Sequence, residues 1–290
     1  MSSTTPTTER DTDRLQRLEK LWSLPRPAVM GILNCTPDSF ADGGRFLGFE
    51  EAVRHGEQLM ADGADIVDIG GESTRPGAEP VAAEEEISRV GPVLKELRHR
   101  HPRALLSIDT VKAEVAEIAL GAGADLVNDV NAGRDPGMLP AVAGHNAGIV
   151  LMHMRGSPRT MQQNTGYADV VAEVTEHLRR GAAAAMAAGI PAEAVWLDPG
   201  IGFGKDDSGN LALLAALPDL ATLGHPIVIG PSQKSFIGRI TGADVGDRLP
   251  GTLGALTTVL ECPRAVVRVH DVRSAVQYLQ IAGAIRSTVR

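Results

Sequence analysis

Aromatic side chains are scarce in this chain. Phe, Trp and Tyr make up 3% of its 290 residues, while hydrophobic residues as a whole make up 43%. Any core must therefore be aliphatic. Cysteine is also rare, because Cys35 and Cys262 are the only two and form no CxxC pair. This excludes a disulfide framework and favours a reducing, cytoplasmic compartment.

Long apolar runs and excess positive charge are absent as well. No apolar stretch reaches the roughly 18 residues that a membrane span requires. The start, "MSSTTPTTERDTDR", lacks the apolar core of a signal peptide and predicts a loose tail. The formal net charge of −8 argues against a broad surface for nucleic acid or anionic membranes, although it allows a local basic pocket.

What the sequence does contain is a repeated alternation of short apolar segments and amphipathic ones. The apolar segments are nearly continuous, which is typical of parallel strands covered by helices on both sides. Predicted strands cover 28–34, 64–70, 104–109, 124–130, 148–154, 194–199, 226–230 and 265–271, and amphipathic stretches between them include 50–61, 83–98 and 168–188. This pattern predicts a single-domain α/β fold, a (β/α)8 TIM barrel.

We place the barrel at 27–290, after a flexible tail and a lead-in helix at 1–26. Leucines at helical spacing predict that helix, and Pro25 and Pro27 end it. A doubly wound sheet is the main rival. Its glycine fingerprint is missing after the first strand, where Gly31 is followed by "ILNCTPDSF". Nor is "GIGFGK" a phosphate-binding loop, because Pro199 stands where the first glycine would be.

Polar side chains close most of the predicted strands. Active sites of barrels form at the carboxyl ends of the strands. The residues at these ends or in the following turn are Asn34, Asp109, Asn128, His153, Asp198, Lys234, Arg268 and His270. Some have structural alternatives, since Asp109 could cap the next helix and His153 could be a satisfied core histidine. Arg268 is harder to explain structurally, because burying it without an anionic partner would cost several kcal/mol.

These side chains suggest two kinds of ligand group. Asp109, Asn128 and Asp198 can hydrogen-bond the edge of a flat, nitrogen-rich heterocycle. A second group of Asn34, Arg268 and His270 suits phosphate oxygens and a Mg²⁺ ion. Loops rich in glycine and proline lie beside them and could close over a ligand.

Eight motifs, in order from about residue 28 to 286, together resemble the dihydropteroate synthases. They read "MGILNCTPDSFADGG", "DIGGESTRPGA", "SIDT", "NDV", "LMHM", "DPGIGFGK", "SQKSFIG" and "RVHDV". Related pterin-binding methyltransferase domains share the fold, but "TPDSF", "ESTRPG" and the Ser-x-Lys-Ser turn favour the synthase. The resemblance implies a cytoplasmic transferase of folate biosynthesis. Such an enzyme joins 6-hydroxymethyl-7,8-dihydropterin diphosphate to 4-aminobenzoate, with Mg²⁺ as cofactor and a homodimer as assembly.

The resemblance also implies a role for each matching residue. The expected pterin site consists of Asp109, Asn128, Met152, Asp198, Phe203 and Lys234, and the expected diphosphate site of Asn34, Arg268 and His270, with Asn34 also placing the metal. The expected aminobenzoate pocket consists of Phe40, Thr74, Pro76, Phe203 and Ser235. Asp42 and Arg75, on two loops that complete the site, join Asp109 and Lys234 as expected catalytic residues. We expect Cys35 to be a packing residue.

One turn departs from the family pattern. The family usually has Ser-Arg-Lys-Ser, whereas this chain has Ser-Gln-Lys-Ser with Gln233 at the second position, after Pro231. Glutamine keeps hydrogen-bonding ability but carries no charge. Sulfonamides mimic 4-aminobenzoate in this pocket, so we hypothesise altered and reduced sulfonamide sensitivity, as in a resistance variant.

Two alternatives stay open at this point. One is a metal-dependent hydrolase or lyase barrel with Asp109, His153, Asp198 and His270 as ligands, although the sequence has no HxH after its first strand and no HExxH. The other is a barrel that binds a pterin without catalysis.

Overall fold

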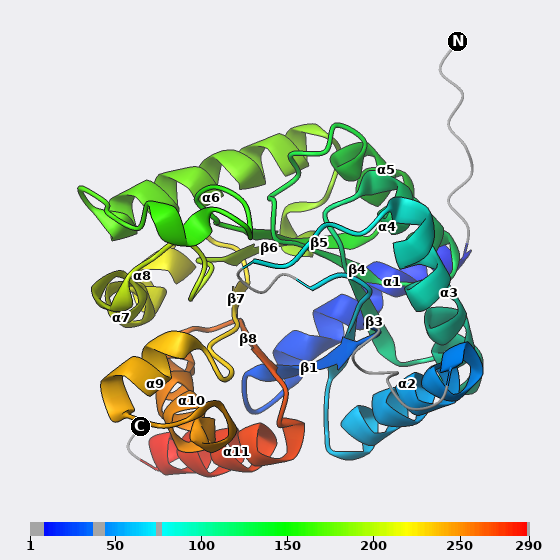
Figure 1. The fold of residues 1–290 in the computed structure, drawn as a ribbon. Coiled ribbons are helices and arrows are strands. Elements are labelled where there is room, and N and C mark those ends of the chain that lie inside the picture. The colour runs from blue at the N-terminus through cyan, green and yellow to red at the C-terminus, as the bar shows by residue number, and fades with distance from the viewer. Residues whose placement is uncertain (1–8, 37–43, 74–76, 289–290) are drawn as a thin grey trace.

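The strands of the protein form a closed ring. The computed structural model describes residues 9–36, 44–73 and 77–288. Within these ranges eight parallel strands pair in chain order, and the last pairs with the first (Figure 1). They are β1 (Ala28–Asn34), β2 (Ile66–Gly70), β3 (Leu105–Asp109), β4 (Leu126–Asp129), β5 (Gly148–Met152), β6 (Val195–Asp198), β7 (Ile227–Ile229) and β8 (Ala265–Val269). The predicted (β/α)8 barrel is confirmed.

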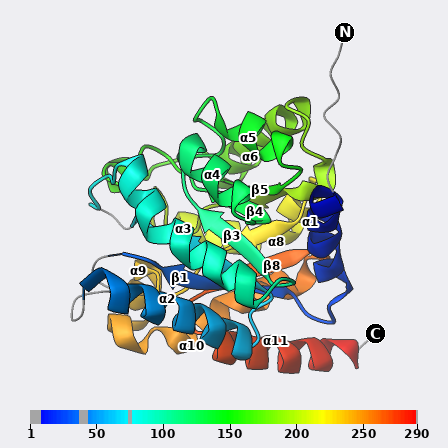
Figure 2. The same ribbon diagram turned by 90° about the vertical axis from the view of Figure 1, so that its right-hand side faces the viewer.

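Helices surround the ring and cover its outer face (Figures 1 and 2). They are α1 (Glu9–Lys20), α2 (Gly44–Ala61), α3 (Ala83–Arg100), α4 (Ala113–Gly121), α5 (Met138–Gly144), α6 (Val170–Ala187), α7 (Asp207–Ala215), α8 (Leu217–Ala221), α9 (Ser235–Thr241), α10 (Leu249–Leu256) and α11 (Val272–Ser287). Three of them begin at an aspartate whose carboxylate accepts a backbone N–H of the first turn: Asp169, Asp206 and Asp271. No helix of the described ranges is both long and apolar enough to cross a membrane.

The aliphatic composition produces two layers of core. The larger lies between the outer face of the strands and the helices and includes Leu33, Ile69, Leu106 and Leu197, all fully buried. The smaller fills the amino-terminal half of the ring interior, around Met30. Because the amino-terminal half of the ring interior is packed with apolar side chains, a polar site inside the ring is expected at the carboxyl ends of the strands.

The lead-in segment closes the amino-terminal end of the ring. Leu18 and Leu21 pack into the inner core, and the Trp22 ring meets that of Trp196 edge to face with centroids 5.3 Å apart. Arg14 of α1 donates to the backbone carbonyl of Leu120 at 2.6 Å, which ties the helix to the barrel. Figure 2 shows α1 on the side of the barrel away from the carboxyl ends of the strands.

Most observed strands are one to three residues shorter than predicted at one or both ends. The flanking residues, such as Asp65 before β2 and His270 after β8, belong to loops. Apolar patterning marks burial, and buried loop residues next to a strand carry the same pattern. The difference matters for the site, because it places several functional candidates in loops that the strands hold.

Candidate active site

Strand register brings polar residues from different strands into one row. Asn34 of β1 pairs with Gly70 of β2, which pairs with Asp109 of β3, which in turn pairs with Asn128 of β4. On the far side of the ring, Met152 of β5 is paired with Asp198 of β6. Residues separated by up to 164 positions in the chain (198 − 34) therefore meet at the same end of the barrel.

Arg268 connects this row to the interior of the ring. Its Nη2 donates to Oδ2 of Asp109 at 2.7 Å, and its Nε donates to Oδ2 of Asp68 at 2.6 Å. Burial opposes the charge of Arg268, but the two carboxylates hold its pKa above the usual range. The sequence predicted an anionic partner for this arginine, and the protein itself supplies two.

Asp109 is almost fully buried, and burial raises its pKa to about 7, although the positive charge of Arg268 works in the opposite direction. It does not cap the following helix: α4 has Lys112 at its N-cap, and the first backbone N–H of that helix, from Ala113, donates to Asp135. The capping alternative is therefore excluded, and the carboxylate faces the cluster of charged side chains.

Asp68 is a site residue that the sequence analysis missed. Its Oδ2 accepts hydrogen bonds from Nδ2 of Asn128 at 2.9 Å and from Arg268. Because a carboxylate only accepts, one N–H of the Asn128 amide is committed to Asp68, and its carbonyl oxygen is left for other partners. A fully buried aspartate within the apolar run "ADIVDIG" carries the same signal that singled out Arg268.

The opposite side of the site holds a carboxylate and an ammonium group. Oδ1 of Asp198 accepts the backbone N–H of Gly200 at 2.6 Å, yet burial raises its pKa to about 6. The half-buried Lys234 places Nζ 3.9 Å from the centroid of the Phe203 ring, a cation–π contact. Burial and, to a smaller extent, the nearby positive charge of Arg268 lower the pKa of Lys234 to about 8.

An apolar wall completes this end of the barrel. Met152 and Phe203 pack with Val130, Met154 and Met161 in a small separate cluster. The space among Asn128, Met152, Asp198, Phe203, Lys234 and Arg268 has a volume of about 20 Å³ in this arrangement. A flat ring could enter only if a long side chain such as Lys234 changes position.

His270 lies beside the turn that contains Lys234. Its Nδ1 is 2.9 Å from Oγ of Ser232, and its backbone N–H donates to the same oxygen at 3.2 Å. Ser235 begins α9 and is exposed. Asn34 is exposed at the end of β1. The sequence grouped Arg268 with Asn34 and His270, whereas its guanidinium contacts Asp109 of the heterocycle group and Asp68.

Other candidates have structural roles or lie outside the described residues. His153 is buried, with Nδ1 3.0 Å from Nζ of Lys205, so it is a satisfied core histidine. Cys35 is fully buried and burial raises its pKa to about 12, as a packing residue requires. Neither cysteine forms a disulfide. Five expected residues fall outside the described ranges: Phe40, Asp42, Thr74, Arg75 and Pro76.

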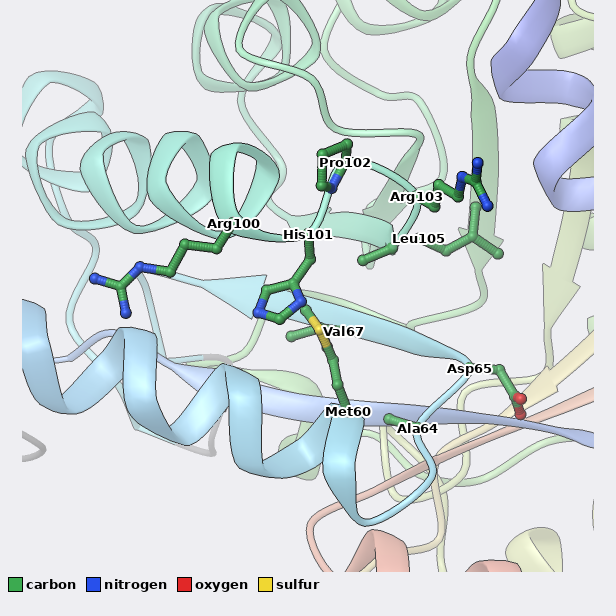
Figure 3. Close-up of a pocket in the computed structure, with 10 residues that line it drawn as sticks. Met60, Ala64, Asp65, Val67, Arg100, His101, Pro102, Arg103 and Leu105 are labelled. Carbon is green, nitrogen blue, oxygen red and sulfur yellow. The ribbon is translucent and has the colours of Figure 1, made fainter.

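A second cavity, of about 540 Å³, lies at the other end of the strands (Figure 3). Met60 and Val67 form part of its apolar floor, and His101 reaches over it from the connection between α3 and β3. Leu105, which also lines it, begins β3, and Asp109 ends the same strand. This cavity is therefore separate from the polar cluster despite its larger volume.

The fold and the site define a class of protein. A (β/α)8 barrel that gathers two buried carboxylates, an amide and two cations at its strand ends has the features of an enzyme for a polar, planar, partly anionic small molecule. Among described residues, no three His, Cys, Asp or Glu side chains lie close enough to share a metal. The described part of the site therefore does not favour the metal-dependent hydrolase alternative.

Comparison with known proteins identifies the family. The model of the pterin binding enzyme family matches residues 30–270. Dihydropteroate synthase of Mycobacterium leprae is 46% identical over 270 residues, which cover 90% of this chain and 94% of that protein. The chain belongs to the pterin-binding enzymes and, within them, to the dihydropteroate synthases.

Solved structures agree with this assignment. Xanthomonas albilineans dihydropteroate synthase with 4-aminobenzoic acid has a TM-score of 0.84 and 46% identity, covering 90% of this chain and 94% of that one. Yersinia pestis dihydropteroate synthase in a sulfonamide drug complex also has a TM-score of 0.84, with 40% identity, covering 90% and 95%.

Proposed function

We propose that this protein is a transferase that makes 7,8-dihydropteroate from 6-hydroxymethyl-7,8-dihydropterin diphosphate and 4-aminobenzoate. The observation that carries the proposal is the row of Asp109 and Asn128 facing Asp198 and Lys234 across the barrel mouth. In the reaction the bond between the pterin methylene carbon and the diphosphate oxygen breaks, and its electron pair leaves with the diphosphate. The amine nitrogen then forms the new C–N bond and loses a proton.

In this proposal the pterin ring binds among Asp109, Asn128, Asp198 and Lys234. Carboxylate and amide oxygens accept hydrogen bonds from ring N–H and NH2 groups, while Lys234 donates to the ring carbonyl side. Met152 and Phe203 provide apolar contact for the faces of the ring. As diphosphate leaves, positive charge develops on the pterin, and the ionised Asp109 stabilises it.

We assign the diphosphate to Asn34, Arg268 and His270, which can donate hydrogen bonds to its oxygens. A Mg²⁺ ion bound mainly through substrate phosphates and water needs few protein ligands, so a single amide oxygen from Asn34 fits it. When bound, such an ion would neutralise charge on the leaving group. Arg268 would then serve two roles, because it also pairs with Asp109.

The aminobenzoate pocket in this proposal combines Phe203 and Ser235 with residues outside the described ranges. These are Phe40, Thr74 and Pro76, with Asp42 and Arg75 completing the site during turnover. The arylamine is a competent nucleophile when neutral, so the chemistry needs no Ser/His or Cys/His pair.

The test is an assay of dihydropteroate and diphosphate formation in which the pterin diphosphate, 4-aminobenzoate or Mg²⁺ is withheld in turn. Omitting the pterin diphosphate or Mg²⁺ should abolish both products, and omitting 4-aminobenzoate should abolish dihydropteroate. Lys234→Ala should weaken binding of the pterin diphosphate sharply, and unchanged affinity would remove Lys234 from the site. Pterin binding without product in the complete mixture would support the non-catalytic barrel instead.

We further propose a homodimer, formed through the exposed face of α10 and α11. Ile281 and Ile285, one helical turn apart, are 65% and 61% exposed. They line a groove of about 520 Å³ with Leu253 and Tyr278. Apolar side chains this exposed favour a partner surface. Ile281→Glu should shift the protein towards monomer in analytical ultracentrifugation, and an unchanged sedimentation coefficient would assign the dimer to another face or exclude it.

Three remaining proposals follow from composition and resemblance. The enzyme acts in the cytoplasm, in keeping with two reduced cysteines. Residues 1–26 form a tail and lead-in helix, and 27–290 form the catalytic barrel. Gln233 reduces sulfonamide sensitivity relative to synthases that have arginine at this position.

A further inference from the structure

Lys205 is a lysine buried among neutral acceptors. Its side chain is 1% exposed. Nζ donates to the backbone carbonyls of Phe203 at 2.8 Å, Gly200 at 2.9 Å and His153 at 3.2 Å, and it lies 3.0 Å from Nδ1 of His153. All four partners come from the ends of β5 and β6 and the loop after β6. A buried ammonium is costly, so one that faces only carbonyls and an imidazole needs an explanation.

The contacts favour the charged form of this lysine. Burial and, to a smaller extent, the positive charge of Lys205 lower the pKa of His153 to about 3, so the imidazole is neutral and can accept at Nδ1. Burial also lowers the pKa of Lys205 to about 7. The acceptors around Nζ work in the opposite direction, because a neutral amine could donate to only two of the four.

The loop that Lys205 holds is intrinsically adaptable. Gly200, Gly202 and Gly204 have φ angles of 70°, 84° and 66°, a region that favours glycine. A side chain at Gly200 would place its Cβ 2.0 Å from the carbonyl oxygen of His153, so the backbone passes very close to β5. Three such glycines in five residues lose much conformational entropy on ordering. The several hydrogen bonds that the Lys205 ammonium makes to backbone carbonyls offset that loss.

This loop carries two features of the pterin site. At its start the N–H of Gly200 donates to Asp198, and near its end the Phe203 ring lies beneath the ammonium of Lys234. Both Gly200 and Phe203 are held through their carbonyls by Lys205. A change in the Lys205 contacts would therefore move the partner of Asp198 and the platform of Lys234 together.

We propose that Lys205 is a positioning residue for the pterin subsite, which fixes the loop 199–204 by gathering its carbonyls around a buried ammonium. Lys205 does not touch the substrates itself. The inference rests on the proposed function, since it assigns the loop to the pterin half of the reaction. It predicts a selective effect: the affinity for pterin diphosphate depends on Lys205, and that for 4-aminobenzoate much less.

The decisive variant is Lys205→Met, which keeps an unbranched chain but removes every donor. We expect its KM for pterin diphosphate to rise at least about tenfold, because small misplacements of binding groups can cost up to about 10²-fold. Its KM for 4-aminobenzoate should stay within about twofold of the wild-type value. Hydrogen–deuterium exchange of the free protein should increase in peptides that contain 199–204.

A matched control separates positioning from general loss of stability. Leu94→Ala removes a fully buried side chain of α3, on the other side of the barrel, and should lower Tm through a cavity. It should not raise the KM for pterin diphosphate or the exchange of 199–204. If Lys205→Met does not fold, Lys205→Gln, which keeps two N–H donors without charge, is compared with Leu94→Ala in the same way.

A selective rise in the pterin KM together with faster exchange of 199–204 supports the proposal. Wild-type pterin KM in the variant, or equal rises in both KM values, overturns it, as does a pterin defect in Leu94→Ala of the same size. If the wild-type protein makes no dihydropteroate, the proposed function fails, and the exchange measurement still decides whether Lys205 holds the loop.

Discussion

Asp109 and Arg268 form an ion pair across the mouth of the barrel, with Nη2 2.7 Å from Oδ2. The pair joins β3 to β8, and the same guanidinium reaches Asp68 of β2. A buried carboxylate that must stabilise a developing cation needs a counter-charge in the absence of that cation. Arg268 supplies one. In the proposed reaction, positive charge develops on the pterin and negative charge on the leaving diphosphate, so the two members of the pair would acquire new partners of opposite sign.

Asp109→Asn should therefore lower kcat by about 10²–10³-fold, the usual cost of removing one electrostatic stabiliser. The amide keeps the shape of the side chain but supplies no negative charge, and Arg268 retains Asp68 as a partner. Steady-state rates of diphosphate release measure the effect. Asp219→Asn, an exposed change in α8, is the control and should keep near wild-type turnover. A fully active Asp109→Asn enzyme would contradict the role of this carboxylate.

The pH dependence of kcat/KM for pterin diphosphate should be bell-shaped. Asp109 must be ionised, and its pKa of about 7 means that activity rises as the pH increases through 7. Lys234 must be protonated, and its pKa of about 8 means that activity falls as the pH increases further. Initial rates between pH 5.5 and pH 9.5 test this, and a flat profile from 6 to 9 would show that these groups do not titrate in the free enzyme.

Asp198 gives a separate prediction for stability. Its pKa is raised from an ordinary 3.8 to about 6, so the folded protein binds a proton more tightly than the unfolded chain does. The stabilising contribution is fully present below about pH 4 and is lost as the pH rises through 6. The change amounts to about 3 kcal/mol at most, because the pKa moves from 3.8 to about 6 and each tenfold change in proton affinity is worth about 1.4 kcal/mol.

The variant Asp198→Asn cannot titrate at this position. Relative to wild type, it should therefore be more stable at pH 8 than at pH 4.5. Chemical denaturation at the two pH values measures the difference. If the wild type and the variant lose the same free energy of unfolding between these pH values, Asp198 does not carry the raised pKa.

The role of Asp68 can be tested against an ion pair at the other end of the strands. Asp68→Asn weakens the anchoring of Arg268 and Asn128, so the KM for pterin diphosphate should rise. The loss of unfolding free energy should stay below the about 3–5 kcal/mol typical of a broken buried pair, because Asp109 still pairs with Arg268.

Asp65→Asn is the matched control, because Asp65 pairs with Arg26 at 2.7 Å just before β2 begins. It should lower stability without changing the KM for pterin diphosphate. Equal changes in KM for both variants would mean that Asp68 contributes only to folding.

The barrel and much of its site could be predicted from the sequence for a physical reason. Parallel strands are buried on both faces, so their apolar runs stand out, and their carboxyl ends meet at one edge. Polar residues that end those runs, such as Asp109 and Asp198, must then lie near one another. The cost of burying a charge pointed to Arg268 in the same way.

The parts of the site that could not be predicted depend on contacts between side chains of different strands. The contact of Asp68 with Arg268 requires side chains from β2 and β8 to face each other, which the sequence of either strand does not specify. Lys205 follows a glycine-rich loop, and lysine is a residue type that is usually exposed. Here the loop folds back around its ammonium and buries it. Most observed strands are shorter than predicted because the apolar, buried pattern continues into the adjoining loops.

Gln233 adopts a conformation that its residue type does not predict. Its φ of 56° is in the left-handed region, which is uncommon for a residue with a side chain. Two contacts from α10 and the residue before it hold the backbone there: the N–H of Gln233 donates to Oγ1 of Thr252, and its carbonyl accepts from Nη1 of Arg248, both at 3.1 Å. The turn is thus fixed by main-chain contacts, and its exposed side chain is free to vary.

Gln233→Arg should therefore change ligand affinity without changing the fold. Because the clamp by Arg248 and Thr252 acts on the backbone, we expect Tm to stay nearly constant. A charged donor can add a hydrogen bond of about 1.5–3 kcal/mol to an anionic or sulfonyl ligand, so the inhibition constant of a sulfonamide should fall about tenfold. Gln58→Arg, which adds the same charge to the groove that Gln233 lines, should leave it unchanged. Equal inhibition of the wild type and Gln233→Arg would show that this position does not set sulfonamide sensitivity.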